Sequence, residues 1–294
     1  RVAVNSLAIL ERESRLGRDE YEQGVTDDLE AYLGEAHGDY QRAIVCRDYE
    51  EPIDLFDRHL YQKGGLVLHM LRQKLGTDVF WAAVGKYLRK HRGSIVETRD
   101  LILALEEESG LSLEKFFDQW VYRAGHPELD VKVSYDDGSL VFDVDQTQGG
   151  DDASVFEFGF EVDVCVDGQW THHRRNIDER KSALVVHTGS RPTALVIDPD
   201  FTVTAPIKLT GPADILRNSL REAPTARGRA AAANALRRRP DPLSITALEQ
   251  CLGRENEAWM VRAEAASALS AISGDAARDA LLAAQSTTHP KVRR

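Results

Sequence analysis

The spacing of hydrophobic residues changes twice along the chain. Up to Pro127 they recur every three or four residues, which predicts helices. One predicted helix ends at Gly76. Another begins with Thr98 as its N-terminal cap and ends at Gly110, and a third opens at Ser112. The first part of the chain is therefore expected to be helical.

After Pro127 the spacing falls to two, which is typical of half-buried β-strands. Hairpin turns are predicted at Asp136-Asp137-Gly138 and at Asp167-Gly168. Several short strands separated by turns indicate a small β-sandwich. The clearest alternating run is Phe156, Phe158, Phe160, Val162, Val164 and Val166.

From about Pro212 the composition shifts to Ala, Arg and Leu, and short segments recur. Ala232–Leu236 returns as Ala265–Leu269, and Val261-Arg262 returns as Val292-Arg293. Repeats of about thirty residues with small residues where helices touch predict an α-solenoid of HEAT-like type. Because Val292-Arg293 would only begin another repeat, we expect the array to be truncated.

These patterns predict a multidomain α+β chain. The expected domains are a helical segment over residues 1–127, a β-sandwich over 128–210 and HEAT-like helical repeats over 211–294.

The charge and the cysteines narrow the function classes. A net charge of -11 over 294 residues argues against a nucleic-acid-binding protein. No apolar run approaches the roughly eighteen residues of a membrane span, so no membrane partner is expected. Cys46, Cys165 and Cys251 form no CxxC pair, which weakly favours a reducing, cytoplasmic compartment.

The chain contains no self-contained catalytic motif. HExxH, GxSxG, P-loop and GxGxxG patterns are all absent from the sequence. His172 and His173 are adjacent in a predicted strand, so their rings should point to opposite faces and chelate poorly. His59 and His69 have no carboxylate at metal-ligand spacing and are expected to be packing or surface residues.

One segment carries a residue order that is more informative than its composition. Residues Asp54–Gly65 contain Tyr61-Gln62-Lys63-Gly64-Gly65 and lead into an apolar helix. They resemble the Tyr-x-Lys-Gly-(Ala/Gly) segment of the M1 family of gluzincin zinc aminopeptidases. The resemblance runs from about Leu10 to Pro206. Further matches follow in order: Gly76–Phe80, Ser109–Leu113, Phe116–Trp120, Gly125-His126-Pro127, and Gln146 with Gln148.

The resemblance implies a fold and a role for one residue. Residues 1–127 would be the helical C-terminal part of a thermolysin-like catalytic domain, and peptides would be the substrate. In this family a tyrosine at the start of a helix faces the zinc and stabilises the oxyanion, which makes Tyr61 the candidate catalytic residue. The alternative is that Tyr61 is only a half-buried aromatic at a helix start.

The family pattern breaks at the zinc ligands. Val4–Ala8 resembles the stretch that carries the family's third ligand, but the glutamate is missing. Glu11 and Glu13 are substitutes by residue type, yet they fit better as surface residues of a helix. Either the zinc is bound by residues upstream of this chain, or the site has degenerated. In both cases the HExxH histidines are missing here, and the chain alone is expected to be inactive.

Two hypotheses follow. The chain is the C-terminal portion of an active zinc aminopeptidase, or it is a non-catalytic peptidase-like scaffold that binds protein partners through its HEAT-like repeats.

Overall fold

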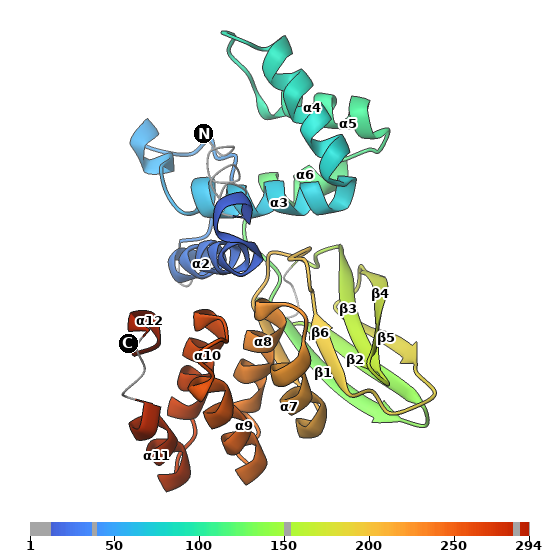
Figure 1. Cartoon of the computed structure of the whole chain (residues 1–294). Coiled ribbons are helices and arrows are strands. Elements are labelled where there is room, and N and C mark those ends of the chain that lie inside the picture. Colours follow the sequence, from blue (N-terminus) through green and yellow to red (C-terminus); the bar gives the residue numbers. More distant parts are fainter. Residues whose placement is uncertain (1–12, 37–39, 150–153, 285–288, 294) are drawn as a thin grey trace. The chain divides into compact units, whose positions relative to one another are not determined.

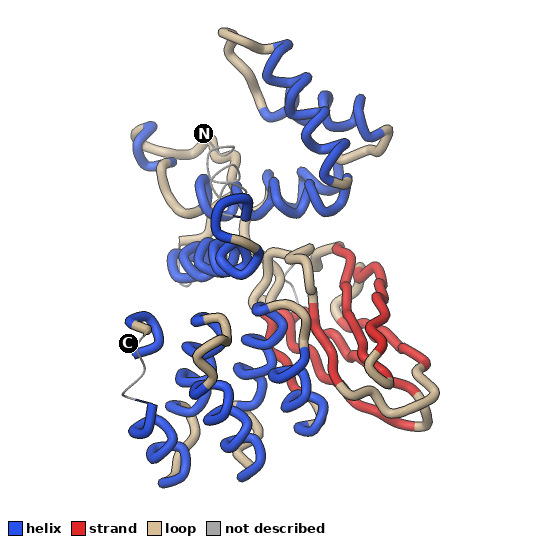
Figure 2. Tube along the Cα trace, in the orientation of Figure 1, coloured by secondary structure: helices blue, strands red, loops and turns tan. Residues whose placement is uncertain are grey.

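The computed structural model describes residues 13–36, 40–149, 154–284 and 289–293. It is a mixed α/β structure with a helical N-terminal part, two β-sheets and a helical C-terminal region (Figures 1 and 2). The chain divides into two compact units. The first unit comprises Arg1–Arg15, Gly24–Pro127 and Asp200–Ala205, and the second comprises Leu16–Gln23, Glu128–Pro199 and Pro206–Arg294.

The first unit is helical, as expected. Helix α2 begins in the second unit and continues into the first. The elements are α2 (Arg18–Ala36), η1 (Pro52–Leu55), η2 (His59–Lys63), α3 (Gly64–Leu75), α4 (Thr77–Lys90), α5 (Thr98–Ser109), α6 (Glu114–Phe117) and η3 (Asp118–Tyr122).

Helix ends were predicted better than helix starts. Gly76 and Gly110 follow α3 and α5 with φ of 82° and 68°, a conformation that glycine adopts without strain. Thr98 is not the cap, because Glu97, one residue earlier, is the N-cap and forms a capping box with Asp100. Ser112 does not open α6 either, since Leu113 is the residue before its first turn.

Residues 200–205 return to the first unit and lie along α3. Nε2 of His69 is 2.9 Å from the carbonyl oxygen of Asp200, and Gln73 donates to the same carbonyl at 3.1 Å. The Thr204 hydroxyl donates to the sulfur of Met70. These contacts make His69 a packing residue, as the sequence predicted.

The second unit contains the β-sandwich. Its strands are β1 (Leu129–Asp136), β2 (Ser139–Gln146), β3 (Phe158–Val166), β4 (Gln169–Ile177), β5 (Lys181–His187), β6 (Ala194–Ile197) and β7 (Ile207–Thr210). The sheets have the orders β5-β2-β1-β7 and β4-β3-β6. Strand β7 pairs with β1 in parallel, which no local pattern had indicated.

The sandwich core follows the predicted alternation. Phe156, Phe158, Phe160, Val162 and Val164 are all buried. Phe142 of one sheet and Phe160 of the other place their ring centroids 6.4 Å apart. The two predicted hairpin turns join β1 to β2 and β3 to β4, with positive φ at their Asp-Gly residues.

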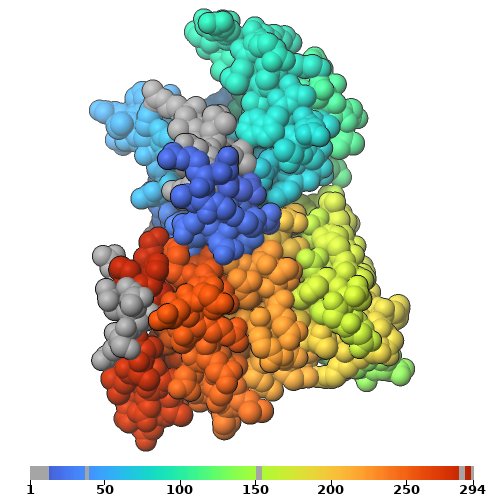
Figure 3. Space-filling view, in the orientation of Figure 1, coloured from blue at the N-terminus to red at the C-terminus, as the bar shows by residue number. Residues whose placement is uncertain are grey.

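The helices described after the sandwich are α7 (Ala213–Glu222), α8 (Ala226–Leu236), α9 (Pro242–Gly253), α10 (Trp259–Ser270), α11 (Asp275–Ala283) and α12 (Pro290–Arg293). The recurring alanine-rich segments lie in α8 and α10, which pack together. In Figure 3 the orange surface of these helices is continuous. Two carboxylates at the start of α2 accept hydrogen bonds from the helical repeats. Glu22 accepts from the Arg227 amide at 2.8 Å, and Glu20 accepts from the Trp259 indole at 2.9 Å.

Helix α8 also packs against β6 through Gly228. A Cβ added to Gly228 would lie 2.9 Å from Cγ2 and 3.0 Å from Cγ1 of Val196. We expect Gly228→Ala to lower the free energy of unfolding by about 1–3 kcal/mol, because overpacking outweighs the better helix propensity of alanine. Urea denaturation measures the change.

Gly34 in α2 is the matched control. A Cβ there meets no atom within 4 Å. Gly34→Ala should therefore raise the free energy of unfolding by about 0.5–1 kcal/mol. Two substitutions with the same sign of effect would contradict the packing argument.

Candidate active site

Tyr61 lies in a π-helical turn rather than in regular α-helix. Element η2 spans His59–Lys63 and runs directly into α3. The Lys63 amide donates to the carbonyl oxygen of Arg58, five residues back, at 3.0 Å. Single π-turns are rare and are found frequently at functional sites.

The side chain of Tyr61 is half-buried. Its ring lies 6.2 Å from the ring of Phe56, measured between centroids. Among the described residues, no hydrogen bond is formed by its hydroxyl. The hydroxyl is therefore available to donate a hydrogen bond to a bound ligand.

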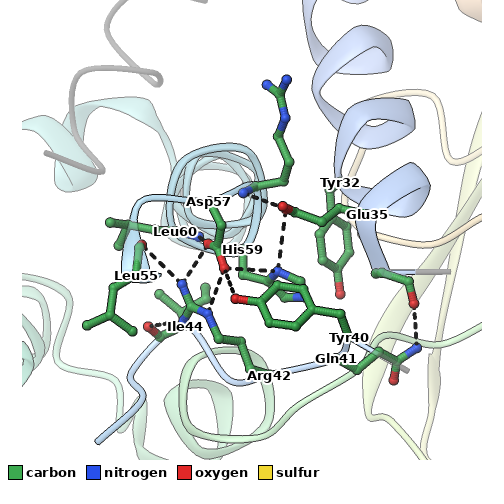
Figure 4. Close-up of polar contacts among 12 residues, drawn as sticks. Tyr32, Glu35, Tyr40, Gln41, Arg42, Ile44, Leu55, Asp57, His59 and Leu60 are labelled. Atoms are coloured by element: carbon green, nitrogen blue, oxygen red, sulfur yellow. Dashed lines mark hydrogen bonds and ion pairs between the residues drawn. The ribbon is translucent and has the colours of Figure 1, made fainter. Parts of the chain in front are cut away.

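Tyr40, Arg42 and Asp57, which we call the Asp57 clamp, hold the beginning of this turn (Figure 4). Oδ1 of Asp57 accepts from the Arg42 guanidinium at 2.6 Å and from the Leu60 amide at 3.0 Å. Oδ2 accepts from Nε of Arg42 and from the Tyr40 hydroxyl, both at 2.7 Å. Asp57 is thus the capping residue of the turn that carries Tyr61.

Arg42 also ties the clamp to the surrounding backbone. Its guanidinium donates to the carbonyl oxygens of Ala43, Ile44 and Leu55. The side chains of Arg42 and Asp57 are only 11% and 9% exposed. Hydrogen bonds that are shielded from water in this way and involve charged groups are stronger than exposed ones.

The clamp keeps Asp57 ionised. Burial alone would raise the pKa of Asp57, but hydrogen bonds from Arg42, Tyr40 and Leu60 outweigh it and lower the pKa. The hydrogen bond to Asp57 raises the pKa of the Tyr40 phenol. The capping carboxylate therefore remains an acceptor for the Leu60 amide at neutral pH.

Lys63 anchors the other end of the turn. Its ammonium is buried, donates to the carbonyl oxygen of Gly125 at 2.9 Å and lies 5.5 Å from the centre of the Tyr32 ring. The Tyr32 hydroxyl is in turn 2.9 Å from Nδ1 of His126. Burial, and secondarily the charge of Arg42, lowers the pKa of Lys63 to about 8.

His59 contradicts part of the sequence prediction. It is fully buried, as a packing residue should be, and its ring makes T-shaped contacts with the rings of Tyr32 and Tyr40. However, two carboxylates do lie near it: Nδ1 is 3.5 Å from Asp57 and 3.7 Å from Glu35. The sequence missed Glu35 because it lies on α2, far from His59 along the chain.

The Glu35, Asp57 and His59 cluster does not suit a metal ion, although its ligand atoms lie within 4.8 Å of one another. Oδ2 of Asp57 already accepts two hydrogen bonds, one of them from the fixed positive charge of Arg42. A cation would have to displace that guanidinium. Burial lowers the pKa of His59 and so favours a neutral ring, a form that by itself would permit metal binding. The charge of Arg42 is what opposes a cation in this cluster.

No other group of three metal-ligating side chains occurs in the described ranges, so they contain nothing that fits the zinc implied by the resemblance. Val4–Ala8 and Glu11 lie outside the described residues, and Glu13 belongs to no such group.

The remaining candidates are structural. Gln146 exchanges two hydrogen bonds with the backbone of Phe156, at 2.8 and 2.9 Å. Gln148 donates to Gln146. His172 pairs with Asp163 across the sheet at 2.8 Å, whereas His173 contacts Thr171 on its own strand.

Two separate segments of the sequence each match a known family. Residues 6–120 match the peptidase family M1 domain, and residues 213–294 match HEAT repeats. No described helix is both long enough and apolar enough to cross a membrane.

Two relatives illustrate the first match. The chain is 35% identical over 111 residues to aminopeptidase M1-A of Oryza sativa subsp. japonica, which covers 38% of this chain and 12% of that protein. It is 33% identical over 88 residues to tricorn protease-interacting factor F2 of Thermoplasma volcanium, covering 30% of this chain and 11% of that protein. The matched segments are thus a small part of either relative.

A solved structure extends the likeness to the fold of nearly the whole chain. The crystal structure of Legionella pneumophila aminopeptidase A in complex with aspartic acid superimposes with a TM-score of 0.69 and 18% identity, covering 97% of this chain and 35% of that one. The helical unit that holds Tyr61, the sandwich and the helical repeats share that architecture. The chain is thus a relative of the M1-family aminopeptidases that carries HEAT repeats over residues 213–294.

Proposed function

We propose that this chain is the C-terminal portion of a zinc-dependent aminopeptidase that removes N-terminal residues from peptides. The observation that carries the proposal is Tyr61, a half-buried tyrosine on a π-turn that is fixed at both ends. It lies within the segment that matches the M1 peptidase domain.

Tyr61 has a defined task in this reaction. When water attacks a peptide carbonyl, negative charge develops on its oxygen, and the tyrosine phenol donates a hydrogen bond to that oxyanion. A donor held in place before the charge develops contributes about 3–4 kcal/mol to the stability of the transition state.

The resemblance implies a zinc ion held by residues upstream of this chain. The described residues do not fit a zinc site, so this chain contributes its phenol and not the metal. The chain alone would then be inactive. We place the enzyme in the cytoplasm, since its three cysteines are free.

The second candidate is a non-catalytic scaffold. It is favoured by the HEAT repeats over residues 213–294, because α-solenoids present extended surfaces to protein partners. A scaffold, however, has no need of a fixed phenol in a peptidase domain. The two functions differ in whether an intact zinc site precedes this chain.

The test compares this chain with the same reading frame extended upstream, which we call the extended protein. We expect only the extended protein to bind about one zinc ion and to hydrolyse an aminoacyl-amide substrate. Zinc content and release of the amide leaving group measure this. If neither protein binds zinc or hydrolyses the substrate, the aminopeptidase proposal fails and the scaffold remains.

A further inference from the structure

We propose that Asp57 is a positioning residue that sets the direction of the Tyr61 hydroxyl. The inference rests on the proposed function and extends it to a residue that does not touch the substrate. Asp57 holds the turn twice: its side chain accepts from the Leu60 amide at 3.0 Å, and its carbonyl oxygen accepts from the Tyr61 amide at 3.2 Å.

The clamp leaves the Asp57 carboxylate little freedom. Each of its two oxygens accepts two hydrogen bonds, from Arg42, Tyr40 and the Leu60 amide. Arg42 cannot follow a movement of Asp57 without losing its own bonds to three carbonyl oxygens. A rotation of the turn about its axis therefore breaks several buried hydrogen bonds at once.

The clamp acts on Tyr61 because the turn is also fixed at its far end. Lys63 is bound to the Gly125 carbonyl, so the turn cannot swing as a whole. The Asp57 cap fixes the backbone conformation of the residues between Arg58 and Lys63. Because this backbone is π-helical, it sets the direction in which the Tyr61 side chain leaves the turn. A displacement of about 1 Å at such a donor can lower the rate about 100-fold.

The Glu35 side chain supports the same turn from α2. It accepts a hydrogen bond from the Arg58 amide at 2.6 Å. The first amides of the turn are thus bound by two carboxylates from different elements, which helix starts require because these amides have no partner within the helix.

The experiment combines kinetics of the extended protein with hydrogen exchange of the chain itself. We expect Asp57→Asn to lower kcat by about 10–100-fold while KM stays within about twofold. Added to Tyr61→Phe, the same substitution should lower kcat by less than about twofold, because its effect passes through the phenol. Tyr40→Phe, which removes one hydrogen bond to Asp57, should cause a smaller loss of kcat and covers the case in which Asp57→Asn fails to fold.

The exchange measurement needs no enzymatic activity. Peptides covering residues 57–64 should exchange faster in Asp57→Asn than in the unchanged chain. Asp100→Asn is the matched control, because Asp100 caps α5 in the same unit by accepting from the Glu97 amide at 2.8 Å. It should alter neither kcat nor exchange over residues 57–64.

The outcomes separate the two proposals. An equal loss of kcat with and without Tyr61→Phe would overturn the positioning role, and so would unchanged exchange over residues 57–64. Faster exchange in Asp57→Asn, together with an unsubstituted extended protein that is inactive, would overturn the proposed function alone.

Discussion

Tyr61→Phe in the extended protein should lower kcat by about 10²–10³-fold and leave its zinc content unchanged. The substitution removes a single hydroxyl whose proposed partner is the oxyanion, and one such donor contributes about 3–4 kcal/mol at the transition state. Binding of the substrate in its ground state should change little, so KM should stay nearly constant. Steady-state hydrolysis of an aminoacyl-amide and metal analysis measure the two quantities.

Tyr122→Phe is the control for this prediction. Tyr122 ends η3, a second π-turn among the described residues of the first unit, and is 43% exposed. Its loss should change kcat by less than about twofold if the effect belongs to Tyr61 rather than to any phenol on a π-turn. Unaltered turnover in Tyr61→Phe would remove Tyr61 from the mechanism.

The second large effect is a dependence of stability on pH that comes from Lys63. Burial lowers its pKa from 10.5 to about 8 in the folded chain, whereas the unfolded chain regains the ordinary value. Between pH 8 and 10.5 the unfolded state therefore binds more protons, and the free energy of unfolding must rise with pH. The rise attributable to Lys63 is roughly 3 kcal/mol across this window.

Other groups also titrate at high pH, so the measurement is a difference between variants. The free energy of unfolding of the chain and of Lys63→Met is measured with denaturant at pH 8 and at pH 10.5. The difference between the unsubstituted chain and the variant should shift in favour of the unsubstituted chain as pH rises. Lys90→Met, at an exposed residue of α4, should show no such change. If the difference in the free energy of unfolding between the chain and Lys63→Met is the same at both pH values, the Lys63 ammonium is solvated in the folded state.

The sequence predicted what is set by local periodicity. The alternation from Phe156 to Val164 appears as a buried sheet face, and Gly76 and Gly110 end helices because their backbone needs a positive φ. Helix starts were harder to predict. At Thr98 the N-cap is Glu97, one residue earlier, and glutamate is not among the residue types that usually mark an N-cap.

The surroundings of Tyr61 could not be predicted from local patterns. Arg42 precedes Asp57 by 15 residues, and Glu35 precedes Arg58 by 23. No local sequence pattern therefore indicates that either pair is in contact. The π-turn was hidden as well, because an element of five residues is too short to show a period of its own in the sequence. The one local signal was Asp57 itself, a good capping residue just before the helix.

The return of residues 200–205 to α3 has a practical meaning for dissecting the protein. The backbone passes between the two units more than once, since Leu16–Gln23 belongs to the second unit and Asp200–Ala205 to the first. A fragment that stops at Pro127 would lose the partners of His69, Gln73 and Met70. A fragment that starts at Glu128 would leave the Trp259 indole and the Arg227 amide without their carboxylates. The two units are interlaced in sequence, so a single cut cannot yield both as complete folding units.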